Sequence, residues 1–101
     1  MLLSISMRTR DGRAYAEALY SENKTIVKAG GKIHPTFNGQ KSVKSIRDNE
    51  KIVDKEGNIL SDVEFSSPSA AAQFVNGNIS NGLRVWKIDG MPLGQFLKNR
   101  A

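Results

Sequence analysis

Residues able to carry out acid–base, nucleophilic or metal chemistry are few in this chain. It contains one histidine, His34, and no cysteine, which excludes thiol catalysis and cysteine-based zinc sites. His34 precedes Pro35 in a glycine-rich loop, and no carboxylate stands at a metal-ligand spacing from it, so we interpret it as a solvated loop histidine. The sequence therefore predicts a protein that is not an enzyme and uses no metal and no cofactor.

The densest group of acidic side chains lies between residues 48 and 56. Its carboxylates alternate with basic side chains, which is typical of a solvated face with local ion pairs. The acidic members are Asp48, Glu50, Asp54 and Glu56, and the basic members are Arg47, Lys51 and Lys55. Because no carboxylate pair for acid–base work stands out, a small hydrolase is the least favoured functional hypothesis.

The charge balance of the chain favours an anionic partner. Fifteen Lys and Arg residues against ten Asp and Glu residues give a net charge of +5, and nucleic acid is the first candidate for such a domain. The densest basic cluster consists of Arg8, Arg10 and Arg13, with Asp11 among them. This cluster is too short and too mixed to be a basic tail.

The most informative stretch runs from Phe65 to Gly77 and continues from Ser80 to Lys87. Ser67 followed by proline predicts a helix start, where free N–H groups of the Ser67–Ser69 turn could hold a phosphate. Arg84 and Lys87 flank Trp86, so charge could stand beside a stacking surface. Structural alternatives remain open for each residue type: capping for the serine, turn geometry for Asn-Gly, and burial in the core for the tryptophan.

These residues resemble a known family. The pattern Ser-Ser-Pro-Ser-Ala-Ala-Ala, then Asn-Gly and Trp-Lys, is similar to a small C-terminal domain of restriction-associated and GIY-YIG nuclease proteins, and to the RAMA domain (restriction-enzyme adenine-methylase-associated). The resemblance spans residues 14–93 and includes the stretch 27–33, where Gly31 stands in place of a serine. It implies a module without enzymatic activity that recognises modified DNA, beside a nuclease or methylase partner.

The sequence thus favours a non-catalytic nucleic-acid-binding module, with a protein–protein adaptor as the alternative. Lys28 and Lys32 bracket the end of one predicted strand, and Arg84 and Lys87 lie in another. If these strands are neighbours, four cations share one surface with the helix start at its edge. The candidate nucleic-acid-binding residues are Lys28, Lys32, Ser67, Ser69, Arg84, Trp86 and Lys87.

The elements that must position these residues follow from periodicity and from breakers such as Asp11-Gly12. Strands are expected over 2–9, 13–21, 25–29, 62–66 and 83–88, with a helix as the alternative for 13–21 because of its alanines. The main helix is expected over Pro68–Asn76, ended by Gly77, with Ala70, Ala71, Phe74 and Val75 buried. Shorter helices are expected over 42–52, capped by Ser42, and over 92–97.

We therefore predict one α+β domain over residues 1–101, in which the helix Pro68–Asn76 packs on a mostly antiparallel sheet. The N-terminal residues lack the order of a signal peptide, and no apolar stretch is long enough for a bilayer span. We accordingly expect a cytoplasmic protein without a membrane partner.

Overall fold

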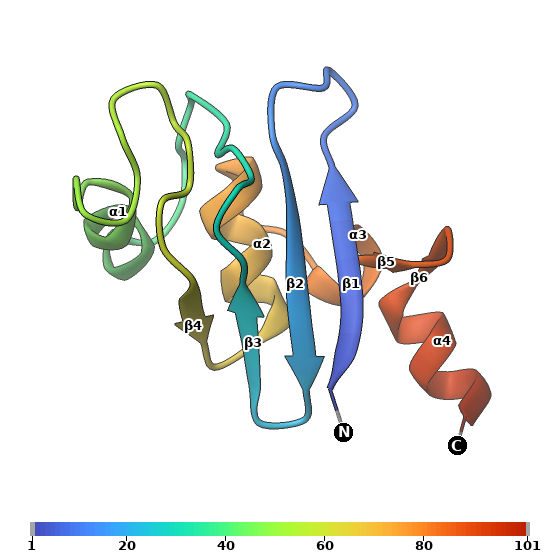
Figure 1. The fold of residues 1–101 in the computed structure, drawn as a ribbon. Helices are drawn as coiled ribbons and strands as arrows, with labels where there is room; N and C mark the ends of the chain where they lie inside the picture. The colour runs from blue at the N-terminus through green and yellow to red at the C-terminus, as the bar shows by residue number, and fades with distance from the viewer. Residues whose placement is uncertain (1, 101) are drawn as a thin grey trace.

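An antiparallel sheet with helices forms the α+β framework predicted from the sequence, and the computed structural model describes it over residues 2–100 (Figure 1). The strand order in the sheet is β4-β3-β2-β1-β5-β6. The strands are β1 (Leu3–Arg8), β2 (Tyr15–Ser21), β3 (Lys24–Val27), β4 (Val63–Phe65), β5 (Lys87–Ile88) and β6 (Met91–Pro92). The helices are α1 (Lys41–Arg47), α2 (Pro68–Asn76), α3 (Gly82–Val85) and α4 (Leu93–Arg100).

Tyr15–Ser21 forms the central strand β2. The sequence allowed either a strand or a helix for this segment. Its residues pair with β1 on one side and with β3 on the other, so that Ala16 and Ala18 point inward and are buried. Small side chains at these two positions let a helix approach the sheet closely. Tertiary packing therefore uses the alanines as contact residues of a strand and overrides their helix propensity.

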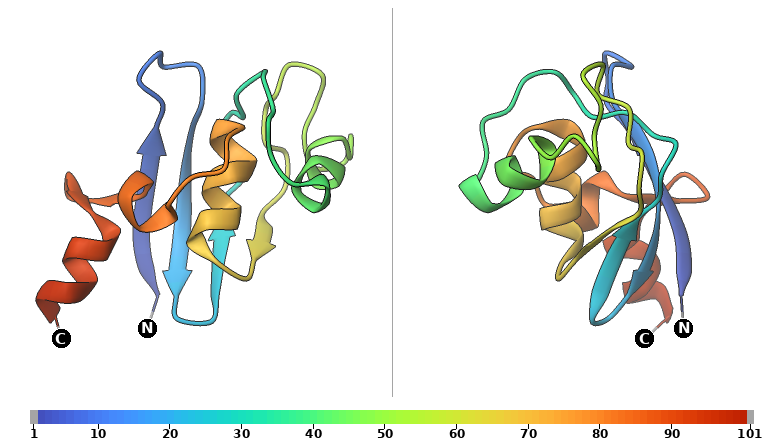
Figure 2. Two further views of the ribbon diagram at one scale, coloured as in Figure 1. Left: turned by 180° about the vertical axis from the view of Figure 1, so that it is seen from behind. Right: turned by 60° about the vertical axis from the view of Figure 1, so that its left-hand side comes forward.

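Helix α2 starts and ends where the sequence predicts. The Ser67 hydroxyl accepts a hydrogen bond from the Ala70 amide at 3.1 Å, and Gly77 ends the helix in the left-handed conformation at φ 83°. The left view of Figure 2 shows α2 lying across one face of the sheet, with α3 beside it. Burial of Ala71, Phe74 and Val75 confirms the predicted contact face, and the Phe74 ring lies 5.3 Å from that of Phe65.

One predicted helix and one predicted strand need correction. Helix α1 begins after Gln40 rather than after Ser42, has no side-chain cap, and ends at Arg47, because residues 49–52 form turns instead of a further helical turn. The predicted strand 83–88 is wrong over its first half. The Asn81 side chain accepts a hydrogen bond from the Leu83 amide at 3.0 Å and caps the short helix α3, so that only Lys87–Ile88 remain extended.

The layers leave one face of the sheet uncovered. α2 and α3 cover the inner face, while α1 lies beyond the β4 edge and α4 lies at the β5–β6 end (Figures 1 and 2). The core between sheet and helices includes Ile5, Val27, Phe65, Phe74 and Trp86. Among the described residues, no helix combines the length and apolar character needed to cross a membrane.

Candidate nucleic-acid interface

The residues of the Ser-Pro-Ser…Asn-Gly…Trp pattern bind one another. The Trp86 indole donates a hydrogen bond to the Pro68 carbonyl at 2.9 Å, and the Ser69 hydroxyl accepts one from the Gly82 amide at 2.9 Å. A Cβ on Gly82 would overlap the backbone of Pro68 and Ser69, so α3 crosses the start of α2 where only glycine fits. We call this arrangement the α2–α3 clasp.

The clasp corrects part of the predicted interface. Trp86 is fully buried and offers no face for stacking, and Ser67 and Ser69 both use their hydroxyls inside the protein. The stacking role predicted for Trp86 is therefore wrong, and the hydroxyls of Ser67 and Ser69 serve the fold. The pattern of these three residues defines how α2 and α3 meet. This agrees with the alternative interpretation of the motif, in which the serine caps a helix and the tryptophan lies in the core.

The predicted surface of four cations does not form, because β3 and β5 are not neighbours. β2 and β1 lie between them in the sheet, and Arg84 belongs to α3 rather than to a strand. Lys28 forms an ion pair with Asp62 at 2.9 Å, and the Ala29 amide donates to the same carboxylate. These two hydrogen bonds, the amide first, lower the pKa of Asp62. Lys28 is thus already paired with a carboxylate. Lys32, Arg84 and Lys87 lie in other segments of the fold.

Lys32 lies in a row of side chains that crosses the uncovered face of the sheet. Arg8 pairs with Tyr15 across β1 and β2, and Tyr15 exchanges backbone hydrogen bonds of 3.0 and 2.8 Å with Lys32. Paired residues of antiparallel strands point to the same face, so the order Arg8, Tyr15, Lys32 places an exposed aromatic ring between two cations. The Arg8 guanidinium lies 5.4 Å from the centroid of the Tyr15 ring.

The row continues at Arg8 into a groove of about 460 Å³ beside β5 and α3. Four cations line this groove, Arg8, Arg10, Arg84 and Lys87, and all four are exposed. Asp11 is the one carboxylate among the lining residues. We call the six residues of the row and the groove the basic strip: Arg8, Arg10, Tyr15, Lys32, Arg84 and Lys87.

Asp11 is held by its own turn and by His34, and among residues 2–100 it forms no ion pair with a cation of the basic strip. Its carboxylate accepts hydrogen bonds from the Arg13 amide at 3.0 Å, from the Thr9 hydroxyl at 2.7 Å, and from His34 Nε2 at 2.9 Å. These contacts, the Arg13 amide first, hold the pKa of Asp11 far below its usual value. The turn between β1 and β2 is thus fixed beside the groove.

His34 differs from the solvated residue that the sequence predicted. Only 14% of its side chain is exposed, because it lies between Asp11 and Thr36. The Thr36 amide can only donate, so Nδ1 accepts its hydrogen bond at 3.2 Å and the ring proton lies on Nε2, facing Asp11. His34 thus joins the β1–β2 turn to the segment before α1. Among residues 2–100, no group of three or more His, Cys, Asp or Glu residues could hold a metal ion.

Comparison with known proteins gives one match. The model of a domain of unknown function, DUF4357, matches residues 6–97, nearly the whole chain. The chain belongs to the DUF4357 family. No curated protein and no solved structure matches it. The likeness to the RAMA domain and the association with nucleases stay predictions.

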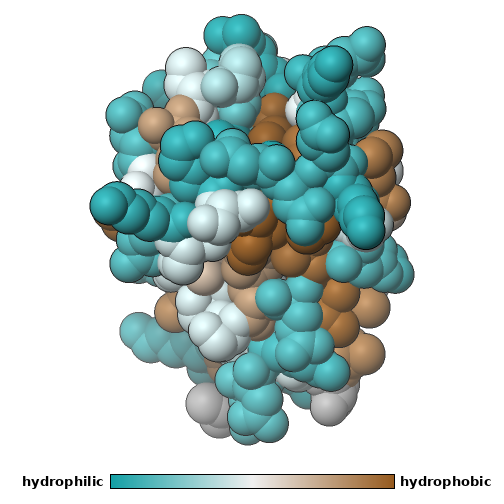
Figure 3. Space-filling view, turned by 90° about the vertical axis from the view of Figure 1, so that its left-hand side faces the viewer, coloured by the Kyte–Doolittle hydropathy of each residue, from teal (hydrophilic) through white to brown (hydrophobic). Residues whose placement is uncertain are grey.

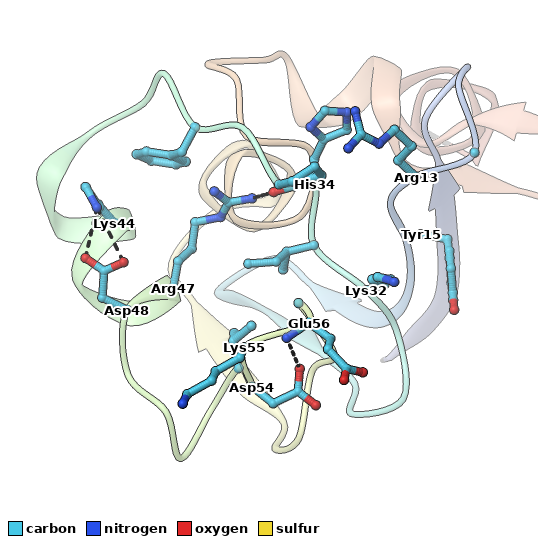
Figure 4. A pocket seen from close by; sticks show the side chains of 16 residues that line it. Arg13, Tyr15, Lys32, His34, Lys44, Arg47, Asp48, Asp54, Lys55 and Glu56 are labelled. Carbon is cyan, nitrogen blue, oxygen red and sulfur yellow. Dashed lines mark hydrogen bonds and ion pairs between the residues drawn. The ribbon is translucent and has the colours of Figure 1, made fainter.

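This DUF4357 domain has a second hollow, between the β1–β2 turn, the segment 32–37, α1 and the turn 53–57. Its volume is about 640 Å³, and Figure 4 shows basic and acidic side chains around it. The face that carries α1 and β4 is mostly hydrophilic, with hydrophobic side chains visible between the hydrophilic ones near its centre (Figure 3). We call this hollow the α1 pocket. Tyr15 and Lys32 belong both to the α1 pocket and to the basic strip.

Sequence reasoning missed Arg8, Arg10 and Tyr15 as interface residues, although it identified Arg8 and Arg10 as part of the densest basic cluster. The signal that could have found the row is the Asp11-Gly12 turn between two alternating strands. Such a turn sets the register of a hairpin, and the register places Arg8 opposite Tyr15 on the outer face.

Proposed function

We propose that this DUF4357 domain is a non-catalytic nucleic-acid-binding module that reads modified DNA beside a nuclease or methylase partner. The observation that carries the proposal is the basic strip. Five cations and an exposed tyrosine line one continuous path from the uncovered sheet face into the groove at its edge. A single aspartate lines the groove, and its carboxylate is engaged by the β1–β2 turn and by His34.

The chemistry of the basic strip suits a phosphate backbone. Among residues 2–100, Arg10, Arg84 and Lys87 have no ion-pair partner, so their charges are available to phosphates. Neighbouring strands lie about 4.8 Å apart, which separates the Arg8 and Lys32 positions by roughly 10 Å. Tyr15 between them can stack on a base, a contact that tolerates any sequence.

The experiment is a fluorescence-anisotropy titration of plain and adenine-methylated duplexes at several salt concentrations. Each phosphate contact removed should reduce the slope of log affinity against log salt by about one, so the double variant Arg84→Ala/Lys87→Ala should lose about two. The matched control is Lys98→Ala, which removes an exposed cation of α4 away from the basic strip. Fold stability should change little in both variants because exposed charges contribute little to it.

Three outcomes separate the hypotheses. A slope that falls in the strip variant and not in Lys98→Ala supports DNA binding by the basic strip. No binding near physiological salt at about tens of micromolar protein, where even non-specific complexes form, would refute it and favour the protein–protein adaptor. Equal affinity for both duplexes would leave DNA binding in place and remove the recognition of a modified base.

A further inference from the structure

The α1 pocket is a preformed cavity beside the basic strip. Its volume of about 640 Å³ lies within the range of small-molecule sites, which is roughly 300–1,000 Å³. Hydrogen bonds between segments fix its walls: the Ile33 amide donates to the Gly57 carbonyl at 2.9 Å, and the His34 amide donates to the Val75 carbonyl at 2.8 Å. The cavity therefore does not depend on a ligand to form.

One wall of the α1 pocket is aromatic and held in place by an arginine. The Arg47 guanidinium lies 4.7 Å from the centroid of the Phe37 ring. Its nitrogens donate to the carbonyls of Phe74, at 3.0 Å, of Thr36, at 3.3 Å, and of His34. Because these bonds use the guanidinium, Arg47 is a structural residue here. Phe37 and Ile33 both line the cavity and offer apolar contact there.

The α1 pocket is lined by more cations than carboxylates. Of the acidic lining residues, Asp48 is paired with Lys44 at 3.0 Å. Asp54 accepts hydrogen bonds from the Asn58 side chain and from amides of its own turn, which lower its pKa. Glu56 is the third acidic residue and is exposed. Among residues 2–100, four lining cations have no ion-pair partner: Arg47, whose guanidinium donates to carbonyls, and Arg13, Lys32 and Lys55.

Charge and apolar wall together match one class of ligand. Three free cations around a cavity fit a phosphate, and an aromatic wall fits a planar base. Figure 4 shows Arg13, Lys32 and Lys55 on different sides of the cavity. Because Tyr15 and Lys32 also belong to the basic strip, a strand lying along the strip passes the mouth of the α1 pocket.

We infer that the α1 pocket binds one nucleotide, with its phosphate attracted by the surrounding cations Arg13, Lys32 and Lys55 and its base against the apolar side chains Phe37 and Ile33. The nucleotide comes from a strand on the basic strip and is unstacked from its neighbours, so this inference rests in part on the proposed function. A free nucleoside monophosphate has the same chemistry and is the second source that the experiment distinguishes.

The test compares a fully matched duplex, the same duplex with one mismatched base pair, and a free deoxynucleoside monophosphate. A mismatched base costs less to unstack, so the protein should bind the mismatched duplex several-fold more tightly. Lys55→Ala removes one exposed cation of the pocket that lies outside the basic strip. It should abolish this preference and weaken monophosphate binding about tenfold, the loss of one charge-assisted contact. Lys98→Ala should leave both unchanged.

The possible outcomes distinguish nucleotide binding in the α1 pocket from DNA binding by the basic strip. Duplex binding without a mismatch preference, unaffected by Lys55→Ala and without monophosphate binding, would overturn the pocket inference and leave the proposed function in place. Monophosphate binding that depends on Lys55, without any duplex binding, would support the pocket as a free-nucleotide site and refute the strip. Monophosphate binding no tighter than that of inorganic phosphate would overturn the role given to the base.

Discussion

Substitution of Gly82 by alanine tests whether the α2–α3 clasp holds the domain together. Gly82 begins α3 without a positive φ, so its backbone conformation is open to any residue. Alanine is the better helix former by up to about 1 kcal/mol, and helix propensity alone therefore predicts that Gly82→Ala stabilises the protein. The contacts of the clasp predict the opposite sign, because a Cβ here would overlap the backbone of Pro68 and Ser69.

The size of the stability loss follows from the displacement of α3 away from α2 that the added Cβ requires. Overpacking against backbone atoms costs about 1–3 kcal/mol, since neither helix can yield by a side-chain rotation. Separating α3 from α2 also stretches two hydrogen bonds, from Gly82 to Ser69 and from Trp86 to Pro68, each contributing about 1 kcal/mol. We expect a loss of about 3–5 kcal/mol in the free energy of unfolding. At about 4–8 °C per kcal/mol, Tm should fall by at least about 12 °C.

Urea unfolding followed by tryptophan fluorescence is the assay, because Trp86 is the only tryptophan and is buried in the clasp. Gly12→Ala is the matched control: its Cβ meets nothing within 4 Å, but its φ of 74° is positive, so it should lose about 1–2 kcal/mol from backbone strain alone. A Gly82→Ala protein as stable as the parent, or more stable, would refute the reasoning on the clasp.

Three further substitutions test the core and the carboxylates. Phe74→Ala should lose about 3–5 kcal/mol in urea unfolding because the ring is fully buried, and a loss below about 1 kcal/mol would contradict its place in the core. Thr25→Val should gain about 1 kcal/mol in the same assay, since the Thr25 hydroxyl is buried without a partner among the described residues, and any loss would contradict this. The lowered pKa values of Asp11, Asp54 and Asp62 stabilise the fold above their unfolded value near 3.8, and this contribution is lost as pH falls through the folded values. Tm should therefore decrease as the pH is lowered below about 4, and this decrease should be less steep in Asp11→Asn. An equal decrease in the variant would contradict this role of Asp11.

Local signals in the sequence were enough to predict several elements. The hairpin of β1 and β2 follows from alternation around Asp11-Gly12, and α2 follows from Ser67, Pro68 and Gly77, whose capping roles act within a few residues. The same locality explains the errors. Residues 83–85 carry an alternating pattern, but the Asn81 cap and the contact of Gly82 with α2 turn them into a helix.

What only the tertiary structure decided is which side chains meet. The order of strands separates Lys28 from Lys87 and places Arg8 beside Tyr15 and Lys32, because β1 and β2 lie between β3 and β5. Burial of Trp86 and the pairing of His34 with Asp11 likewise join residues far apart in the chain. The sequence alone determined that the domain is basic, lacks thiols and folds as α+β. Where its free charges gather depends on long-range packing, which no local pattern encodes.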